Sequence, residues 1–306
     1  MVRETAATSG SIPVISERLV QAHALGGVES HVPELGLKRG MRAADEPRMR
    51  PLLRVLLALV AFGVLATPAQ AILNGSPDLA HPYVGLLAMR SGGDVVEVCS
   101  GSLVAPQLFL TAGHCTAEIE AEGAEALVSF APAFDPAGEL VSGTAVTHPG
   151  FTVTGQGRVQ NDVGVVLLDE PVTDLGFAAL PALDTLGRLP RQGKGQILTS
   201  VGYGASGFVR GGGNPQPIFF DVRQSTTMRL IQLGSAPMDG FNLQMTNNPG
   251  NGGGICFGDS GGPLLLGSSS TVVGVNSYVA NWNCSGYSVG ARVDTESVLS
   301  FLAAYL

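Results

Sequence analysis

The chain has 306 residues, of which 42 are glycine and 19 are proline, and only 14% are charged. Its formal net charge of −8 argues against nucleic acids and anionic membrane surfaces as partners. Many short apolar runs in a glycine-rich, charge-poor chain favour an all-β protein over a helical bundle.

A secretory signal peptide is expected at residues 49–71. Arg50 and Arg54 supply a positive start, an apolar run follows from Val55 to Ala66, and the Ala-Gln-Ala at 69–71 supplies small residues for cleavage. The apolar run is shorter than the roughly 20 residues that cross a bilayer, so no stable membrane span is expected. These features predict a secreted or periplasmic protein.

Residues 1–48 precede this signal, although a signal peptide normally stands at the start of a chain. They mix proline, glycine and charges without a sustained period. We expect translation to begin at or near Met49, with Met41 as another candidate start. A disordered extension is the alternative.

All four cysteines follow the signal: Cys99, Cys115, Cys256 and Cys284. An even number of cysteines in an exported chain indicates two disulfides, and three pairings are open. Closeness in sequence favours Cys99 with Cys115 and Cys256 with Cys284. A zinc site is disfavoured because no Cys-x-x-Cys or histidine-rich spacing is present.

An acidic cluster at 117–125 has carboxylates that could bind calcium, but it lacks EF-hand spacing. A solvated charged surface is favoured there. No metal or other cofactor is therefore expected.

Short strand-like runs, separated mostly by glycine, proline, asparagine or serine, fill most of the chain after the signal. Such a pattern predicts a barrel or a sandwich. A boundary is expected at 183–195, a segment rich in glycine, proline and basic residues. Only the end of the chain, 295–306, has a helical pattern, with Thr295 as N-cap and apolar residues on one face at 298, 299, 302 and 305.

The stretch ICFGDSGGPLLL, Ile255 to Leu266, places Ser260 among glycines. Glycine permits backbone conformations and close approaches that other residues block. A backbone that aims its N–H groups at a small anion needs this freedom. The stretch therefore indicates a nucleophilic serine beside an oxyanion hole.

A nucleophilic serine needs a base, and the chain offers five histidines. His23 and His31 precede the cleavage site, and His81 and His148 each precede a proline, which is typical of surface turns. His114 lies in LFLTAGHC, where an apolar strand ends in small residues. His114 is the candidate base, and a structural histidine at a strand end is the alternative.

A catalytic histidine also needs an orienting carboxylate. Asp162 lies in QNDVGVVLL, directly before an apolar run of strand character. A buried acid at that position needs a partner, which an imidazole N–H would supply. A turn-forming aspartate after Asn161 is the alternative.

In this order, LTAGHC, NDVGVVLL and GDSGGP resemble the trypsin/chymotrypsin family of serine proteases. The resemblance covers 72–306 and implies an all-β fold of two antiparallel Greek-key β-barrels, about 72–185 and about 190–306, with a C-terminal helix. The active site would lie between the barrels. Together with export, the intact motifs suggest a bacterial source.

The resemblance also implies the mechanism established for this family. His114 would take the proton of Ser260, Asp162 would orient the imidazole, and the N–H groups of Gly258 and Ser260 would bind the oxyanion of an acyl-transfer intermediate. GDSGG also fits the G-x-S-x-G pattern of lipases and esterases, but their histidine follows the serine. No histidine follows Ser260 here, so that fold is excluded.

In this family the amino group of a newly formed N-terminal residue pairs with the aspartate before the nucleophile. ILNG, from Ile72, is similar to the usual IVGG start, with Leu73 and Asn74 as departures. Signal cleavage after Ala71 would expose Ile72 for a pair with Asp259. We therefore expect no separate activation peptide.

The resemblance places Gly254 at the base of the primary specificity pocket, where trypsin-like members carry aspartate. Ser277 would line the pocket, Val279 would narrow it, and Ser288 would form another wall. These residues predict a preference for small or medium uncharged side chains.

The implied activity is that of a secreted serine endopeptidase acting on protein or peptide substrates, with protein inhibitors as further partners. The alternatives are a catalytically silent binding or regulatory protein on the same scaffold, or an esterase with the same triad. The complete set of three motifs favours the endopeptidase.

Overall fold

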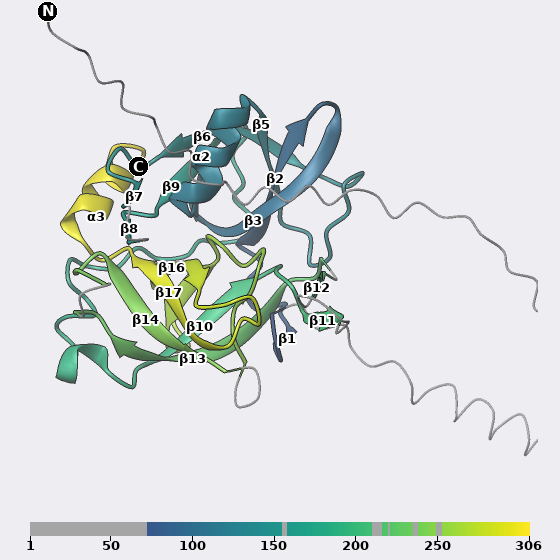
Figure 1. Ribbon diagram of the computed structural model, residues 1–306. Helices are drawn as coiled ribbons and strands as arrows, with labels where there is room; N and C mark the ends of the chain where they lie inside the picture. The colour runs from purple at the N-terminus through teal and green to yellow at the C-terminus, as the bar shows by residue number, and fades with distance from the viewer. Residues whose placement is uncertain (1–71, 155–157, 210–215, 220, 235–237, 249–252) are drawn as a thin grey trace, which may run out of the picture. The chain divides into compact units, whose positions relative to one another are not determined.

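Two rings of antiparallel strands are present in the computed structural model of the chain (Figure 1). The structure describes residues 72–154, 158–209, 216–219, 221–234, 238–248 and 253–306. The expected signal peptide at 49–71 and the segment 1–48 lie outside the described residues.

The first barrel contains six strands whose side chains fill its interior. The strands are β2 (Val84–Ser91), β3 (Asp94–Ala105), β4 (Leu108–Thr111), β5 (Glu125–Ser129), β6 (Val141–Thr147) and β9 (Gly164–Leu168). They close in the order β2-β3-β4-β9-β6-β5. The fourth strand, β5, returns to lie beside the first, β2, which is the Greek-key pattern.

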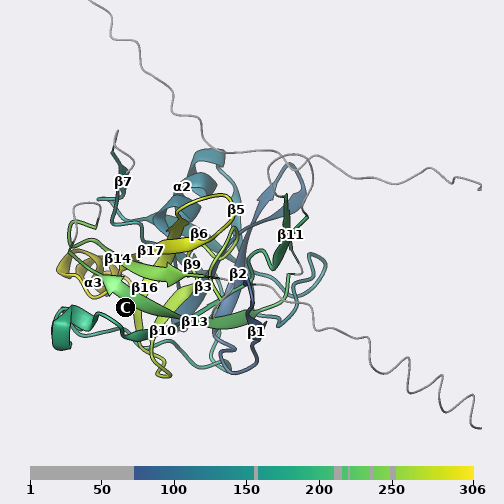
Figure 2. The same cartoon turned by 60° about the horizontal axis from the view of Figure 1, so that its bottom comes forward.

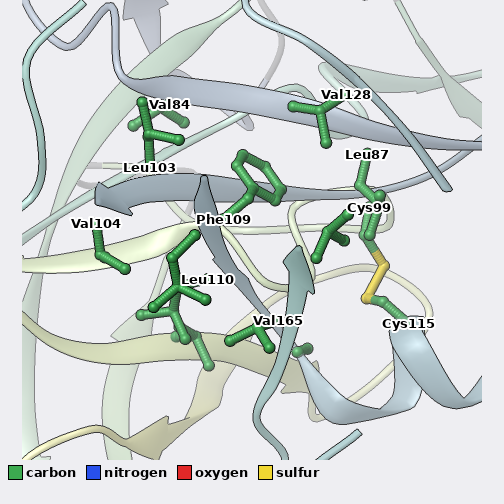
Figure 3. Packing of buried hydrophobic residues seen from close by; sticks show 14 of the residues in the cluster. Val84, Leu87, Cys99, Leu103, Val104, Phe109, Leu110, Cys115, Val128 and Val165 are labelled. Atoms are coloured by element: carbon green, nitrogen blue, oxygen red, sulfur yellow. A yellow bond between two sulfur atoms is a disulfide. The ribbon is translucent and has the colours of Figure 1, made fainter. Parts of the chain in front are cut away.

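Phe109 fills the interior of this barrel, and its ring is fully buried (Figure 3). A Cβ atom on Gly101 of β3 would lie 2.3 Å from the Phe109 ring, so this strand position must be glycine. Val128 and Leu87 pack in the same cluster (Figure 3). The core thus explains the run of apolar residues on these strands.

The second barrel repeats this topology. Its strands are β10 (Ile197–Gly202), β13 (Gln224–Gln232), β14 (Asn242–Asn247), β15 (Pro263–Leu266), β16 (Val272–Val279) and β17 (Gly286–Arg292). The pairings close a ring in the order β10-β13-β14-β17-β16-β15, again with the fourth strand beside the first. The predicted all-β fold of two antiparallel barrels is confirmed.

Among the described residues, five shorter strands lie outside the two rings. β1 (Ser76–Pro77) pairs with β13 of the second barrel, and Figure 2 shows the two side by side. Two small hairpins stand apart: β7 (Thr152–Val153) with β8 (Val159–Gln160), and β11 (Gly207–Val209) with β12 (Gln216–Ile218).

The predicted C-terminal helix is confirmed as α3, Glu296–Ala303. The Thr295 side chain accepts a hydrogen bond from the N–H of Val298, as an N-cap does. Val298 and Leu302 are buried in an apolar cluster to which both barrels contribute.

The expectation that only the chain end is helical is wrong, because α2 spans Gly113–Glu122. Alanine and glutamate favour helix over strand, so most of the acidic cluster 117–125 belongs to α2. The helix ends at Gly123, which adopts φ 60°. A short 3₁₀ turn, η1 (Pro190–Gly193), lies in the connection between the barrels. Within the described segments, no helix combines the length and apolar character needed to cross a membrane.

Candidate active site

His114 and Asp162 meet where α2 begins. α2 follows β4 directly, and Thr111 of β4 pairs with Gly164 of β9, so the start of the helix lies beside the residues that precede β9. Gly164 is required because a Cβ atom there would lie 2.2 Å from the Thr116 hydroxyl oxygen of α2. Strand pairing and helix packing together bring Asp162 to His114.

The Asp162 carboxylate accepts hydrogen bonds from both the backbone and the ring of His114. The backbone N–H of His114 donates to Oδ1 of Asp162 at 2.8 Å. Nδ1 of the ring lies 2.9 Å from Oδ2 and 3.1 Å from Oδ1. The imidazole therefore has little freedom to rotate away from the carboxylate.

A third donor reaches this carboxylate from the second barrel. The Ser277 hydroxyl of β16 donates to Oδ2 of Asp162. Ser277 is 5% exposed and Asp162 is 1% exposed, so this hydrogen bond is shielded from solvent. It links a carboxylate of the first barrel to a strand of the second.

These contacts set the charges of the pair. Burial alone would raise the pKa of the Asp162 carboxyl, but the neighbouring His114 and the hydrogen bonds outweigh it and hold the pKa below its usual value. Burial would lower the pKa of the His114 imidazole, but the charge and hydrogen bond of Asp162, with a smaller effect of Glu118, raise it. The His114 side chain keeps 38% exposure, so its ring can reach a ligand.

Ser260 and His114 line two neighbouring cavities. One, of about 290 Å³, is bounded by His114 and Asp162 together with Phe151, Val153, Val159, Ser277 and Tyr278. The other, of about 170 Å³, is bounded by Ser260 together with Ile255, Cys256, Phe257, Ser277, Tyr278 and Val279. Ser277 and Tyr278 belong to both cavities. No hydrogen bond between His114 and Ser260 is present among the described residues, and such contacts commonly lengthen in ligand-free enzymes.

The loop that carries Ser260 presents free backbone donors. Gly258 has φ 89°, a left-handed conformation that favours glycine. Within the described part of the chain, the N–H groups of Gly258 and Ser260 donate to no other group. Two unpaired donors two residues apart are suited to a small anion.

Ser100 of the first barrel fixes this loop, and sequence analysis missed it. Its N–H donates to the Ser260 carbonyl at 2.7 Å, and its hydroxyl donates to the Gly258 carbonyl at 2.9 Å. A Cβ atom on Gly261 would lie 2.4 Å from the Ser100 carbonyl oxygen. Ser100 stands in the small-residue stretch CSGS, which carries no pattern that would have singled it out.

Asp259 is fully buried behind the nucleophile. Its carboxylate accepts hydrogen bonds from the N–H of Gly204 at 2.9 Å and of Cys256 at 2.8 Å. Burial raises the pKa of Asp259 to about 7, although both backbone donors lower it. Ile72 is also buried, but no ion pair joins it to Asp259 among the described residues of the uncleaved chain. A buried carboxyl without a cation is poorly stabilised as an anion.

The residues expected to shape a specificity pocket fall into two groups. Ser277 and Val279 line the cavity beside Ser260. Gly254 and Ser288 do not line it; Ser288 is buried and its hydroxyl faces the sulfur of Met228 at 3.8 Å. Ile255 supplies an apolar wall that sequence analysis did not assign.

Two disulfides flank the site. Cys99 is joined to Cys115 in α2, as Figure 3 shows, and Cys256 is joined to Cys284. The sulfur atoms of Cys99 and Cys115 lie within 4.8 Å of a His114 ring nitrogen, but each sulfur is committed to the disulfide. This cluster therefore offers no thiolate to a metal ion.

Residues 74–299 match the protein family described as Trypsin. The chain belongs to the trypsin family. A trypsin-family relative, alkaline C trypsin from Manduca sexta, is 29% identical over 243 residues, covering 74% of this chain and 90% of that protein. The CLIP domain-containing serine protease B10 of Anopheles gambiae is 25% identical over 231 residues. That match covers 66% of this chain, which spans only 60% of the Anopheles protein.

The trypsin fold is also shared with a solved structure of HL collagenase. The TM-score is 0.60 at 21% identity, and the match covers 76% of this chain and 98% of that chain. The two relatives named above are insect proteins, so nothing here supports the bacterial source suggested by the sequence.

Proposed function

We propose that this trypsin-family protein is a secreted serine endopeptidase with His114, Asp162 and Ser260 as its catalytic triad. The observation that carries the proposal is the buried Asp162 carboxylate, which accepts hydrogen bonds from the backbone N–H of His114 and from its ring Nδ1–H, next to the cavity that Ser260 lines. A buried carboxylate bound to a partly exposed imidazole fits an orienting group and its base.

The hydrogen bonds assign the roles. Because Asp162 accepts from Nδ1, the neutral ring keeps its proton there and leaves Nε2 free as a proton acceptor. Nε2 takes the proton of the Ser260 hydroxyl as the oxygen attacks a peptide carbonyl carbon. The same proton then passes to the leaving amine, and water releases the acyl group in a second step.

The N–H groups of Gly258 and Ser260 are the proposed oxyanion hole. Neither donates to another group among the described residues, so no such hydrogen bond is lost when an anion forms between them. Loss of one such donor typically lowers kcat by about 10²–10³.

Export and maturation are part of the proposal. Two disulfides suit an oxidising extracellular or periplasmic compartment. Signal cleavage after Ala71 would give Ile72 a free amino group, and the uncompensated Asp259 carboxyl is a suitable partner for it. In that case export itself would complete the active enzyme.

The substrates proposed are proteins and peptides with a small or medium uncharged side chain before the cleaved bond. None of the described residues that line the Ser260 cavity carries a charge, and Val279 and Ile255 give it apolar walls. A basic side chain would therefore lose its hydration without gaining a partner.

The test uses residues 72–306, the Ser260→Ala variant, and Ser268→Ala as matched control, because Ser268 is an exposed serine of the same barrel. Casein and a small peptide ester are the substrates. Casein cleavage that is lost in Ser260→Ala and kept in Ser268→Ala supports an endopeptidase. Ester hydrolysis alone indicates an esterase, and no turnover of either substrate indicates a silent scaffold. Either result overturns the proposal.

A further inference from the structure

Asn247, the last residue of β14, lies behind the Ser260 cavity and is fully buried. Its Nδ2 donates to the Ile255 carbonyl at 3.0 Å and to the Cys284 carbonyl at 2.8 Å. Its Oδ1 accepts from the Ile255 N–H at 2.8 Å. One side-chain amide thus holds both backbone groups of Ile255 and ties them to Cys284.

These contacts connect residues of the cavity lining. Ile255 lines the cavity, and Cys284 is joined by a disulfide to Cys256, which also lines it. Ile255 lines the cavity, but Gly254 does not. The space next to Gly254 is already filled, since a Cβ atom there would lie 2.5 Å from Oδ1 of Asn247.

We propose that Asn247 is a specificity-determining residue that limits the depth of the primary pocket. It fixes Ile255 as the floor and occupies the volume into which a longer substrate side chain would extend. This inference rests on the proposed function, which it deepens by naming the residue that sets substrate size.

The cavity also disfavours cationic side chains. An ammonium or guanidinium group at the end of the pocket needs an anionic partner, and none of the described residues that line the cavity carries a charge. Long apolar side chains are excluded by volume and long basic ones by the lack of an anionic partner. The substrates that remain carry short, uncharged side chains.

The test compares the wild-type protein with Asn247→Gly and with Asn247→Ser, which keeps a hydroxyl for one of the three hydrogen bonds. Thr246→Val is the matched control. Thr246 is the preceding residue of β14, and its hydroxyl accepts instead from the N–H of Arg229. The substrates are succinyl tetrapeptide p-nitroanilides that differ only in the residue before the nitroanilide: Val, Leu, Tyr or Lys.

For the wild-type protein we expect kcat/KM to be highest for Val or Leu. In Asn247→Gly, the ratio of kcat/KM for Tyr to that for Val should rise by about tenfold or more, a change typical of altered pocket volume. Asn247→Ser should show a smaller rise, and Thr246→Val none. A wild-type preference for Tyr or Lys, or an unchanged ratio in a folded Asn247 variant, would overturn the inference.

Binding measurements separate this inference from the proposed function. Calorimetry with Ser260→Ala and Ser260→Ala/Asn247→Gly uses peptides that end in Val or Tyr and needs no turnover. The inference is supported if Ser260→Ala binds the Val peptide more tightly than the Tyr peptide and if this difference in affinity shrinks in Ser260→Ala/Asn247→Gly. This result would support the role of Asn247 even if the chain is catalytically silent. Equal binding of both peptides by Ser260→Ala, or binding of neither, contradicts it.

Discussion

The buried carboxyl of Asp259 should make the stability of the uncleaved chain depend on pH. Burial raises the pKa of this group from 3.8 to about 7. A difference of about 3 pKa units corresponds to about 4 kcal/mol in the free energy of unfolding. Between these two pKa values the folded chain keeps a proton that the unfolded chain has lost. The stability that this carboxyl contributes is therefore full below about pH 4 and is lost, by about 4 kcal/mol in total, as the pH rises from about 4 through about 7.

A free amino group at Ile72 should abolish this loss, because a cation beside Asp259 favours its ionised form. The comparison uses two proteins in the Ser260→Ala background, which prevents self-cleavage. One starts at Ile72, and the other keeps a short leader before it. Urea unfolding is followed from pH 4 to pH 8 by the fluorescence of Trp282, the single tryptophan.

The protein with the leader should lose more stability across this range than the protein that starts at Ile72. Asp259→Asn in the protein with the leader isolates the carboxyl, since its pH slope should match that of the cleaved form whatever its absolute stability. Parallel curves for the two starting proteins would refute the pairing of Ile72 with Asp259. An unchanged slope in Asp259→Asn would refute the buried carboxyl as its cause.

Three further predictions follow from the site and the disulfides. Asp162→Asn should lower kcat by about 10⁴, because the amide cannot fix the imidazole in the useful tautomer, whereas a loss below tenfold in peptide hydrolysis would contradict this role. Since the pKa of His114 is raised, its neutral form is lost as the pH falls, and the acidic midpoint of kcat/KM should lie above 6.5 in assays from pH 5 to pH 9. Replacing Cys256 and Cys284 with serine should lower the free energy of unfolding by about 3–4 kcal/mol, given a separation of 28 residues; a urea midpoint equal to that of the wild type would exclude this.

The sequence was informative where one local pattern decides the structure. Apolar strands such as LFLT and PLLL are buried in cores, and Thr295 caps α3 as its position predicts. The order of the histidine, aspartate and serine motifs also indicated the family correctly. These features depend on neighbouring residues and on spacing, which can be read along the chain.

The sequence was uninformative where contacts between distant segments decide the structure. β6, VSGTAVT, is polar and half-buried, and it forms only because β5 and β9 pair with it on either side. Asn247 stands among asparagines and glycines that predict only a loop, yet its amide holds Ile255. α2 is a different case: its alanines and glutamates favour a helix, but the acidic cluster was interpreted only as a solvated charged surface. Tertiary contacts therefore override local propensity in β6 and at Asn247.

The candidate site depends on how the two barrels meet. Ser277 of the second barrel donates to Asp162 of the first, and Ser100 of the first barrel donates to the loop carrying Ser260 in the second. Gly261 permits this approach, because any side chain there would collide with Thr111 and Ser100. One apolar cluster contains residues of both barrels and a second cluster lies within the second barrel, but neither barrel holds the triad or fixes the oxyanion loop alone. Separation of the barrels would remove the Ser277 and Ser100 contacts together and would open the apolar cluster that both barrels share, so activity and the fold should be lost together.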